Sequence, residues 1–215
     1  MSILITGASG MLGKALSEVY PDADLLSGRS EVDLTNFESV NKFFHGKRYN
    51  TIIHCAAYTD LNYCELEPLK AFKLHATVVR ILQDHCDKLI YISTNPTDSL
   101  RYYYVSNITL QRSDDLVIRA NIYGLGGLFE WVVDSLKSSN KFFGYDDVLF
   151  NPVSVYQLAN FISNYSKDYF GVVNVCSDSI LSKYQFILDV AKNLNIDPIN
   201  LEACKKNIDL DLTVP

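Results

Sequence analysis

The sequence predicts an α/β protein of the Rossmann type, a doubly wound parallel sheet with a small C-terminal lobe. Short apolar runs alternate along the chain with longer amphipathic segments, and a glycine-rich motif joins the first run to the first such segment. Near-continuous apolar runs such as residues 89–92 are typical of strands buried on both faces of a parallel sheet. Strands that alternate with helices form right-handed βαβ units, which stack into such a sheet.

The elements follow from these runs in chain order. The expected strands are residues 3–6, 24–26, 51–56, 88–93, 116–119 and 172–175. The expected helices are residues 11–20, 36–44, 66–86, 104–110, 128–138, 155–165 and 183–194. Thr35 followed by Glu38 predicts a capping box at the start of the second helix, and Ser154 and Ser182 predict N-caps for the last two helices.

Size, charge and composition narrow the class of protein. A chain of 215 residues that is 48% hydrophobic can bury a full core, and a formal net charge of -6 argues against nucleic-acid binding. The five cysteines lack CxxC spacing and the four histidines lack ligand spacing, so we expect reduced thiols and no metal site. We find no signal peptide and no apolar stretch approaching 18 residues, and therefore expect a cytoplasmic protein without a membrane segment.

The glycine-rich motif carries the strongest functional signal. Residues 6–13 read TGxxGxxG, directly after the first strand and at the start of the first helix. Gly7 permits the tight turn, Gly10 lets the backbone approach a pyrophosphate, and Gly13 lets the helix pack closely on the sheet. The strand before and the helix after favour a dinucleotide site over a plain glycine-rich turn. Ser9, Met11 and Leu12, inside the motif, are expected to contact the cofactor as well.

The end of the second strand bears on the choice of cofactor. An acidic residue there would accept from the 2′-hydroxyl of NAD, whereas an arginine can bind the 2′-phosphate of NADP. Arg29, followed by Ser30, stands at this point and favours NADP(H) over NAD(H). The alternative, an ordinary solvated arginine in a loop, stays open.

Further segments resemble a known family. They are residues 6–13, Asp33-Leu34-Thr35, His54-Cys55-Ala56-Ala57-Tyr58-Thr59, Tyr91-Ile92-Ser93-Thr94 and Arg119-Ala120-Asn121-Ile122-Tyr123-Gly124, with a weaker match at Asn151-Pro152-Val153. With them the chain resembles the extended short-chain dehydrogenase/reductases, and within them the dTDP-4-dehydrorhamnose reductase family. The likeness runs from end to end and is most specific in the first 95 residues.

The resemblance implies further cofactor and substrate contacts. It puts Asp33 and Leu34 beside the adenine, and the segment Cys55, Ala56, Ala57 and Tyr58 along the cofactor. It implies substrate contacts at Asn121 and Pro152. It also implies an NAD(P)-binding Rossmann domain over residues 1–123 and a small substrate-binding lobe over residues 124–215, packed together as one structural unit.

The catalytic residues also follow from the resemblance, and here the sequence departs from the pattern. The family uses a hydroxyl donor and a Tyr-x-x-x-Lys motif, which correspond to Thr94, Tyr103 and, at the lysine position, Asn107. An uncharged Asn107 cannot depress the pKa of a tyrosine as an adjacent cation does. Asn95 replaces the family's aspartate, and His75 stands where an asparagine is expected on the long helix. A packed, structural role stays open for His75 and for the consecutive tyrosines Tyr102, Tyr103 and Tyr104.

Two functions therefore remain. One is an NAD(P)H-dependent oxidoreductase of carbohydrate biosynthesis, a reductase or reductase/epimerase of a nucleotide-linked 4-keto-6-deoxy sugar, with an impaired active site. The other is a non-catalytic nucleotide- or NADP-binding protein of the same fold. The regulatory beta subunit of methionine adenosyltransferase is a precedent for that role. The expected partners are the nucleotide sugar and either a second copy or, for a non-catalytic protein, another chain. We expect neither nucleic acid nor membrane as a partner.

Overall fold

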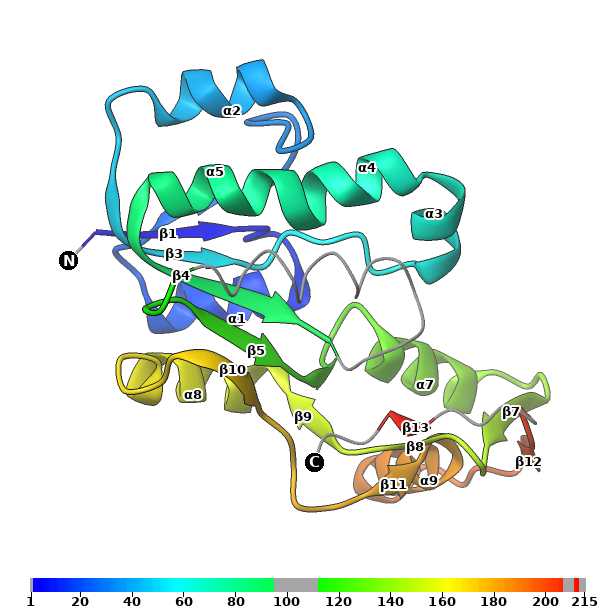
Figure 1. The fold of residues 1–215 in the computed structure, drawn as a ribbon. Helices are drawn as coiled ribbons and strands as arrows, with labels where there is room; N and C mark the ends of the chain where they lie inside the picture. The colour runs from blue at the N-terminus through cyan, green and yellow to red at the C-terminus, as the bar shows by residue number, and fades with distance from the viewer. Residues whose placement is uncertain (1, 95–111, 207–210, 213–215) are drawn as a thin grey trace.

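A six-stranded parallel sheet forms the centre of the computed structural model, which describes residues 2–94, 112–206 and 211–212. Its strands follow the order β10-β5-β4-β3-β1-β2. They are β1 (Ile3–Thr6), β2 (Asp24–Leu26), β3 (Tyr49–His54), β4 (Cys86–Ser93), β5 (Leu116–Arg119) and β10 (Gly171–Asn174). Helices cover both faces of the sheet (Figure 1). The predicted doubly wound α/β fold is confirmed.

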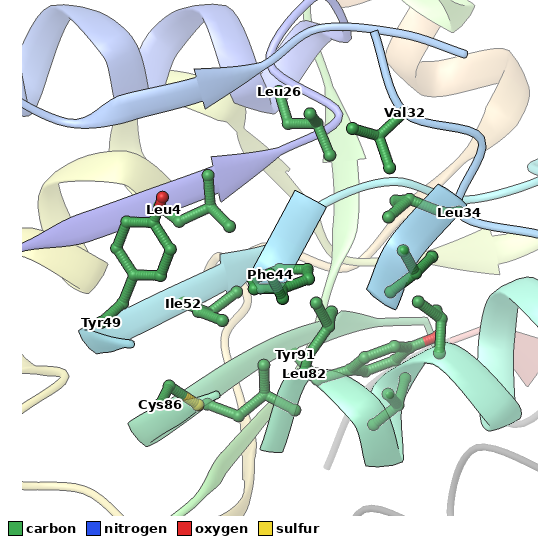
Figure 2. Close-up of a cluster of buried hydrophobic side chains, with 14 of the residues drawn as sticks. Leu4, Leu26, Val32, Leu34, Phe44, Tyr49, Ile52, Leu82, Cys86 and Tyr91 are labelled. Atoms are coloured by element: carbon green, nitrogen blue, oxygen red, sulfur yellow. The ribbon is translucent and has the colours of Figure 1, made fainter. Parts of the chain in front are cut away.

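One face of the sheet packs against α2 (Phe37–Phe44) and α5 (Val78–Asp84). Successive side chains of a strand point to opposite faces, so Leu4, Ile52 and Leu89 meet these two helices. Phe44 of α2 is fully buried in this layer (Figure 2). Every second residue of each apolar run thus contributes to the core on this face of the sheet.

The other face packs against α1 (Met11–Val19) and α8 (Val155–Tyr165). The neighbouring strand residues Ile5, Ile53 and Ile90 point to this side and are buried. Because both faces are covered, the strands read as apolar runs rather than as alternating patterns.

The start of α2 corrects one prediction. Asn36, not Thr35, caps this helix, because the Asn36 side chain accepts hydrogen bonds from the backbone N–H groups of Glu38 and Ser39. The Thr35 hydroxyl instead donates to the Asp33 carboxylate at 2.7 Å. The predicted capping box at Thr35 and Glu38 is therefore wrong. The N-caps predicted at Ser154 and Ser182 are confirmed, each as a full capping box.

The long helix predicted over residues 66–86 is broken into several parts. The structure has α3 (Leu61–Leu66), α4 (Pro68–Phe72), a π-helical segment Lys73–Thr77 and then α5, while Cys86 already belongs to β4. Pro68 has no backbone N–H and favours the first position of a helix, which separates α3 from α4. The π-helical segment Lys73–Thr77 is a tertiary feature that apolar spacing does not reveal.

The C-terminal lobe is built on α7 (Leu128–Lys137) and α9 (Lys183–Leu194). Its short strands were not predicted: β6 (Asn121–Tyr123), β7 (Phe142–Tyr145), β8 (Leu149–Phe150), β9 (Pro152–Ser154), β11 (Leu181–Ser182), β12 (Leu201–Cys204) and β13 (Asp211–Leu212). Between β9 and β11 the chain returns to the main sheet through α8 and β10, so the sheet draws on residues both before and after position 123. The division into residues 1–123 and 124–215 stays a prediction.

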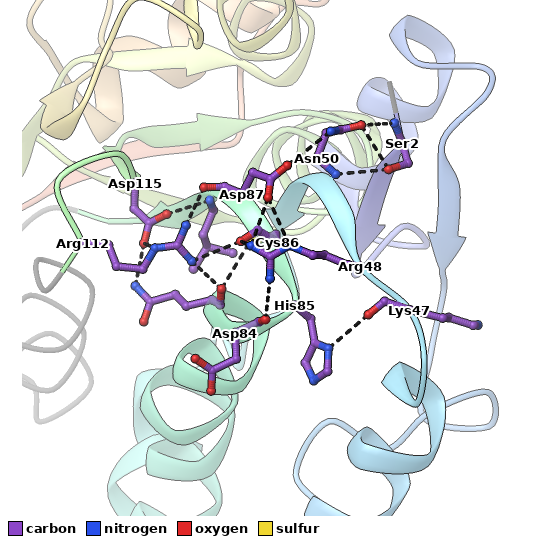
Figure 3. Close-up of polar contacts among 12 residues, drawn as sticks. Ser2, Lys47, Arg48, Asn50, Asp84, His85, Cys86, Asp87, Arg112 and Asp115 are labelled. Atoms are coloured by element: carbon purple, nitrogen blue, oxygen red, sulfur yellow. Dashed lines mark hydrogen bonds and ion pairs between the residues drawn. The ribbon is translucent and has the colours of Figure 1, made fainter.

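Two arginines fix the amino-terminal edge of the sheet (Figure 3). Arg48 donates to the carbonyl oxygens of Asp84 and Cys86, at 2.9 and 3.1 Å, and Arg112 donates to that of Cys86 at 3.3 Å. These guanidinium groups satisfy carbonyls where α5 ends and β4 begins, a place where helix carbonyls lose their partners. In the part of the chain that the structure describes, no helix is long and apolar enough to cross a membrane.

Candidate functional site

A cavity of about 760 Å³ opens at the carboxyl edge of the sheet. It lies over β1 and β3, between which the strand order changes direction, because β2 pairs with one side of β1 and β3 with the other. Open α/β sheets bind ligands at such a switch point. Of the residues predicted to contact the cofactor, numbers 7, 9–13, 29, 33–34 and 55–58 line the cavity, and Ser30 does not.

The three glycines of the motif have different reasons to be glycine. Gly7 has φ +68°, and a Cβ there would lie 2.6 Å from the backbone nitrogen of Ala56. A Cβ on Gly13 would lie 2.3 Å from the carbonyl oxygen of Gly7. A Cβ on Gly10 would meet only that same oxygen, at 3.2 Å. Gly7 and Gly13 therefore serve the fold, whereas Gly10 leaves room on the cavity side.

The first turn of α1 presents backbone amides to this room. Gly10 is the N-cap residue and offers no side chain to satisfy the N–H groups that follow it. Gly10, Met11, Leu12 and Gly13 all line the cavity. Unsatisfied N–H groups and the positive end of the helix dipole favour an anion here. The residues fit the pyrophosphate of a dinucleotide.

The loop after β2 brings a cation and a carboxylate to the rim of the cavity. Arg29 donates from Nη2 to the Tyr58 hydroxyl, and its Cζ atom lies 5.1 Å from the centroid of the Tyr58 ring. The hydrogen bond from the Thr35 side chain, helped by the charge of Arg29, lowers the pKa of the Asp33 carboxyl. Asp33 is therefore a carboxylate that the Thr35 hydrogen bond and the Arg29 charge stabilise.

Two buried histidines stand behind the cavity wall. His54, at the end of β3, has Nδ1 2.7 Å from the Thr6 hydroxyl and Nε2 3.4 Å from the Leu74 carbonyl oxygen. Burial lowers its pKa to about 4, so the ring is neutral near pH 7. His75 is 1% exposed, and its Nε2 accepts the Tyr58 backbone N–H at 3.2 Å. Both are packed and hydrogen-bonded.

Cys55 lies in the cavity wall between these histidines in sequence. Burial raises the pKa of its thiol, so a thiolate nucleophile is disfavoured at this position. Its contribution is that of a small apolar side chain against the neighbouring core.

The predicted catalytic and substrate residues are only partly brought together. Thr94 follows β4 and lines the cavity. Tyr103 and Asn107 lie outside the described residues, as does Asn95. Asn121 and Pro152 face one another in the β6–β9 pair, and neither lines the cavity.

The sequence analysis predicted a substrate-binding C-terminal lobe but did not name the residues by which that part of the chain reaches the cavity. Gly126, Gly127 and Leu128, at the start of α7, line the cavity. A Cβ on Gly127 would lie 2.8 Å from the sulfur of Met11, so this turn packs directly on the first motif. A signal was present in the sequence, because a second glycine-rich stretch, Gly124-Leu125-Gly126-Gly127, also precedes a helix.

Comparison with known proteins adds to this geometry. The family model of the RmlD substrate binding domain matches residues 1–97. The dTDP-4-dehydrorhamnose reductase of Aggregatibacter actinomycetemcomitans is 33% identical over 101 residues, which are 43% of this chain and 34% of that protein. The chain is therefore similar to the extended short-chain dehydrogenase/reductase superfamily. Within this superfamily it is similar to the dTDP-4-dehydrorhamnose reductases, although the match spans only about a third of that curated relative.

Solved structures extend the likeness over almost the whole length of the chain. A hypothetical dTDP-4-dehydrorhamnose reductase from Sulfolobus tokodaii superposes with a TM-score of 0.84 at 25% identity, covering 99% of this chain and 91% of that one. The dTDP-4-dehydrorhamnose reductase of Bacillus anthracis in complex with NADP superposes at 0.81 and 22% identity, covering 95% and 85%. The second likeness concerns the fold alone.

Proposed function

We propose that the chain binds NADP(H) in this cavity and acts as a reductase, or reductase/epimerase, of a nucleotide-linked 4-keto-6-deoxy sugar, with an impaired active site. The observation that carries the proposal is the glycine loop, which lines a cavity at the switch point of the sheet and where a Cβ added at Gly10 would meet only the Gly7 carbonyl oxygen, at 3.2 Å. The similarity to the dTDP-4-dehydrorhamnose reductases supports the choice of substrate class.

Each part of the cofactor has residues suited to it. The amides of residues 11–13 suit the pyrophosphate, and the Arg29 guanidinium suits a 2′-phosphate, which favours NADP(H) over NAD(H). When bound, the nicotinamide supplies or accepts a hydride. Thr94 then donates a hydrogen bond to the carbonyl oxygen of the substrate, on which negative charge develops. Tyr103 is the proposed acid that delivers the proton to this oxygen.

The impairment follows from the residue at the lysine position. Asn107 can hydrogen-bond a ribose but carries no charge, so the pKa of the tyrosine phenol stays nearer its usual value of about 10. A neutral phenol remains an acid, and reduction is retained. The reverse oxidation suffers more because it needs the phenolate as a base.

A second candidate is a non-catalytic NADP-binding protein that acts through a partner chain. Asn95 and Asn107 favour it, because both replace ionisable residues of the family pattern while the glycine loop is intact. Loss of a positioned acid or base component lowers the rate about 10²- to 10⁴-fold without removing a binding site.

Cofactor binding is tested by titration with NADPH, followed by nicotinamide fluorescence. We expect the wild type to bind and Gly10→Val to fail, since a branched side chain would occupy the space of the pyrophosphate. Gly10→Ala, with a single Cβ, should weaken binding less. Thermal unfolding without ligand controls for folding, and NADPH at 100 times its Kd should stabilise only the binding variants, by about 2.7 kcal/mol. Equal binding by wild type and Gly10→Val would exclude this use of the loop.

A further inference from the structure

The imidazole of His75 connects the central sheet with the wall of the cavity. Its Nε2 accepts the Tyr58 N–H at 3.2 Å, so the proton of the neutral ring is on Nδ1, which lies 3.2 Å from the hydroxyl oxygen of Tyr91. Tyr91 is 2% exposed and belongs to β4. Tyr91 of the buried strand β4 thus holds the His75 ring, and this ring in turn holds the Tyr58 backbone.

The π-helical segment Lys73–Thr77 holds this imidazole in place. Leu74, the residue before His75, offers its carbonyl oxygen to the His54 ring at the end of β3. Two consecutive residues of the segment therefore contact β3 and the loop that follows it. Short π-helical insertions are frequent at functional sites, where they change the direction of a side chain.

Tyr58 in turn holds Arg29. The Tyr58 ring meets the His75 ring edge-on, with centroids 6.1 Å apart, and carries the Arg29 guanidinium over its face. The Tyr58 hydroxyl accepts one N–H of the Arg29 guanidinium. A guanidinium has five N–H donors, so others can bind a phosphate. A side chain held before the ligand arrives loses less conformational entropy on binding. The nearby Asp33 carboxylate accepts hydrogen bonds from the Thr35 N–H and hydroxyl, and its interaction with Arg29 is through charge.

We propose that His75 and Tyr58 are positioning residues that set the preference for 2′-phosphorylated adenine nucleotides. His75 fixes the Tyr58 backbone, and the Tyr58 phenol holds the Arg29 guanidinium at the cavity rim, where it meets the 2′-phosphate. The inference rests on the proposed function, because it requires an adenine dinucleotide in the cavity. It assigns to His75 a role in recognition and not in proton transfer.

The test uses two probes that differ only in the 2′-phosphate, adenosine 2′,5′-bisphosphate and adenosine 5′-monophosphate. Calorimetric Kd values for both give a preference ratio for each variant. Tyr58→Phe keeps the ring and removes the hydroxyl, and should lower this ratio about 2- to 10-fold, because the bisphosphate loses more affinity than the monophosphate. Tyr156→Phe, an exposed tyrosine of α8 that does not line the cavity, is the matched control.

His75 is tested in the same assay. His75→Phe keeps a ring of similar size but offers no acceptor to the Tyr58 N–H, and should lower the ratio. His75→Gln, whose amide oxygen can accept that N–H, should recover most of it. If His75→Phe fails to fold, the preference ratios of Tyr58→Phe and His75→Gln still test the inference.

The outcomes separate the inference from the function on which it rests. If neither nucleotide nor NADPH binds the wild type, the proposed function fails and the inference with it. If the wild type prefers the bisphosphate and Tyr58→Phe keeps the full preference, the inference is overturned and the function stands. If both nucleotides weaken equally in the variants, the two residues only maintain structure, and the inference is likewise overturned.

Discussion

At the scale of single residues, the exposed side chain of Arg29 carries the argument about cofactor choice. It stands in the loop after β2 and lines the cavity, and one of its N–H groups donates to the Tyr58 hydroxyl. A planar guanidinium binds phosphate through two parallel N–H groups, which an ammonium cannot do. The residue type and its position together favour a doubly charged 2′-phosphate.

Replacing Arg29 should remove the preference for NADPH. A charge-assisted hydrogen bond to phosphate contributes about 1.5–3 kcal/mol, so Arg29→Ala should reduce the NADPH-over-NADH affinity ratio roughly 10- to 150-fold. Arg29→Lys keeps the charge without the planar fork and should retain part of the ratio. Fluorescence titration with both cofactors measures this. Equal affinity of the wild type for NADPH and NADH would refute the role of Arg29.

His54 should make the stability of the fold depend on pH. Its pKa of about 4 lies below the 6.5 of a free imidazole, so between these values the unfolded chain binds a proton that the folded chain does not. The free energy of unfolding is therefore fully retained above pH 6.5. It falls by up to about 1.4 kcal/mol per pH unit as the pH drops towards 4.

Urea unfolding at several pH values between 4.5 and 7 measures this slope. His54→Gln should lose the part of the slope that the buried imidazole contributes. His45→Gln, which changes an exposed histidine after α2, should keep it. An identical slope in wild type and His54→Gln would show that the ring is already protonated in the fold, or that other groups dominate.

At the scale of elements, Asp115 joins α5 to the starts of β4 and β5. Its carboxylate is 2% exposed, accepts the Leu89 N–H at 2.8 Å and the Gln83 amide at 2.6 Å, and lies 3.6 Å from Arg112 (Figure 3). All three partners meet at the edge opposite the cavity. This cluster therefore contributes to stability rather than to ligand binding.

Asp115→Ala should destabilise the fold by about 2–4 kcal/mol, because it leaves the Leu89 N–H and the Gln83 amide buried without an acceptor. Asp115→Asn keeps one oxygen and should lose less. Asp114→Ala, at the exposed neighbouring position, should change stability by under about 0.5 kcal/mol. The measurement is urea unfolding, and a loss below 1 kcal/mol for Asp115→Ala would contradict this account.

At the scale of the whole molecule, the proposed cofactor cavity and the altered residues of the family's catalytic pattern lead to one prediction about turnover. The wild type should reduce a dTDP-4-keto-6-deoxy sugar weakly or not at all, well below the ordinary range of about 1–10³ s⁻¹. Asn107→Lys should raise the rate by supplying the missing charge, and Tyr103→Phe should abolish it. NADPH consumption with this substrate is the measurement.

The outcomes distinguish the two proposed functions. Turnover of the wild type in the ordinary range would refute the impaired site. Activity that survives Tyr103→Phe would refute the assignment of the acid. If all three proteins bind NADPH and none consumes it, the non-catalytic role gains support and a search for a partner chain follows.

The sequence by itself determined the succession of the main strands and helices along the chain and the place of the glycine-rich loop. Local apolar runs predict the buried parallel strands, and serines at helix starts predict the capped helices. The spacing of Gly7, Gly10 and Gly13 predicts the loop. Only local chemistry is needed for these features. The N-cap of α2 was misread because Asn36 and Thr35 are both good caps, and the choice depended on the Asp33 carboxylate that takes the Thr35 hydroxyl.

The tertiary structure alone decided which distant residues meet. It brought the start of α7 onto Met11, returned α8 and β10 to the sheet, and inserted the π-helical segment Lys73–Thr77 that carries His75. These contacts join segments far apart in the chain, so no local pattern encodes them. The Tyr58 hydroxyl and the Arg29 guanidinium meet for the same reason. Arg29 follows β2 and Tyr58 follows β3, and both strands pair with β1, which fixes where the two loops begin.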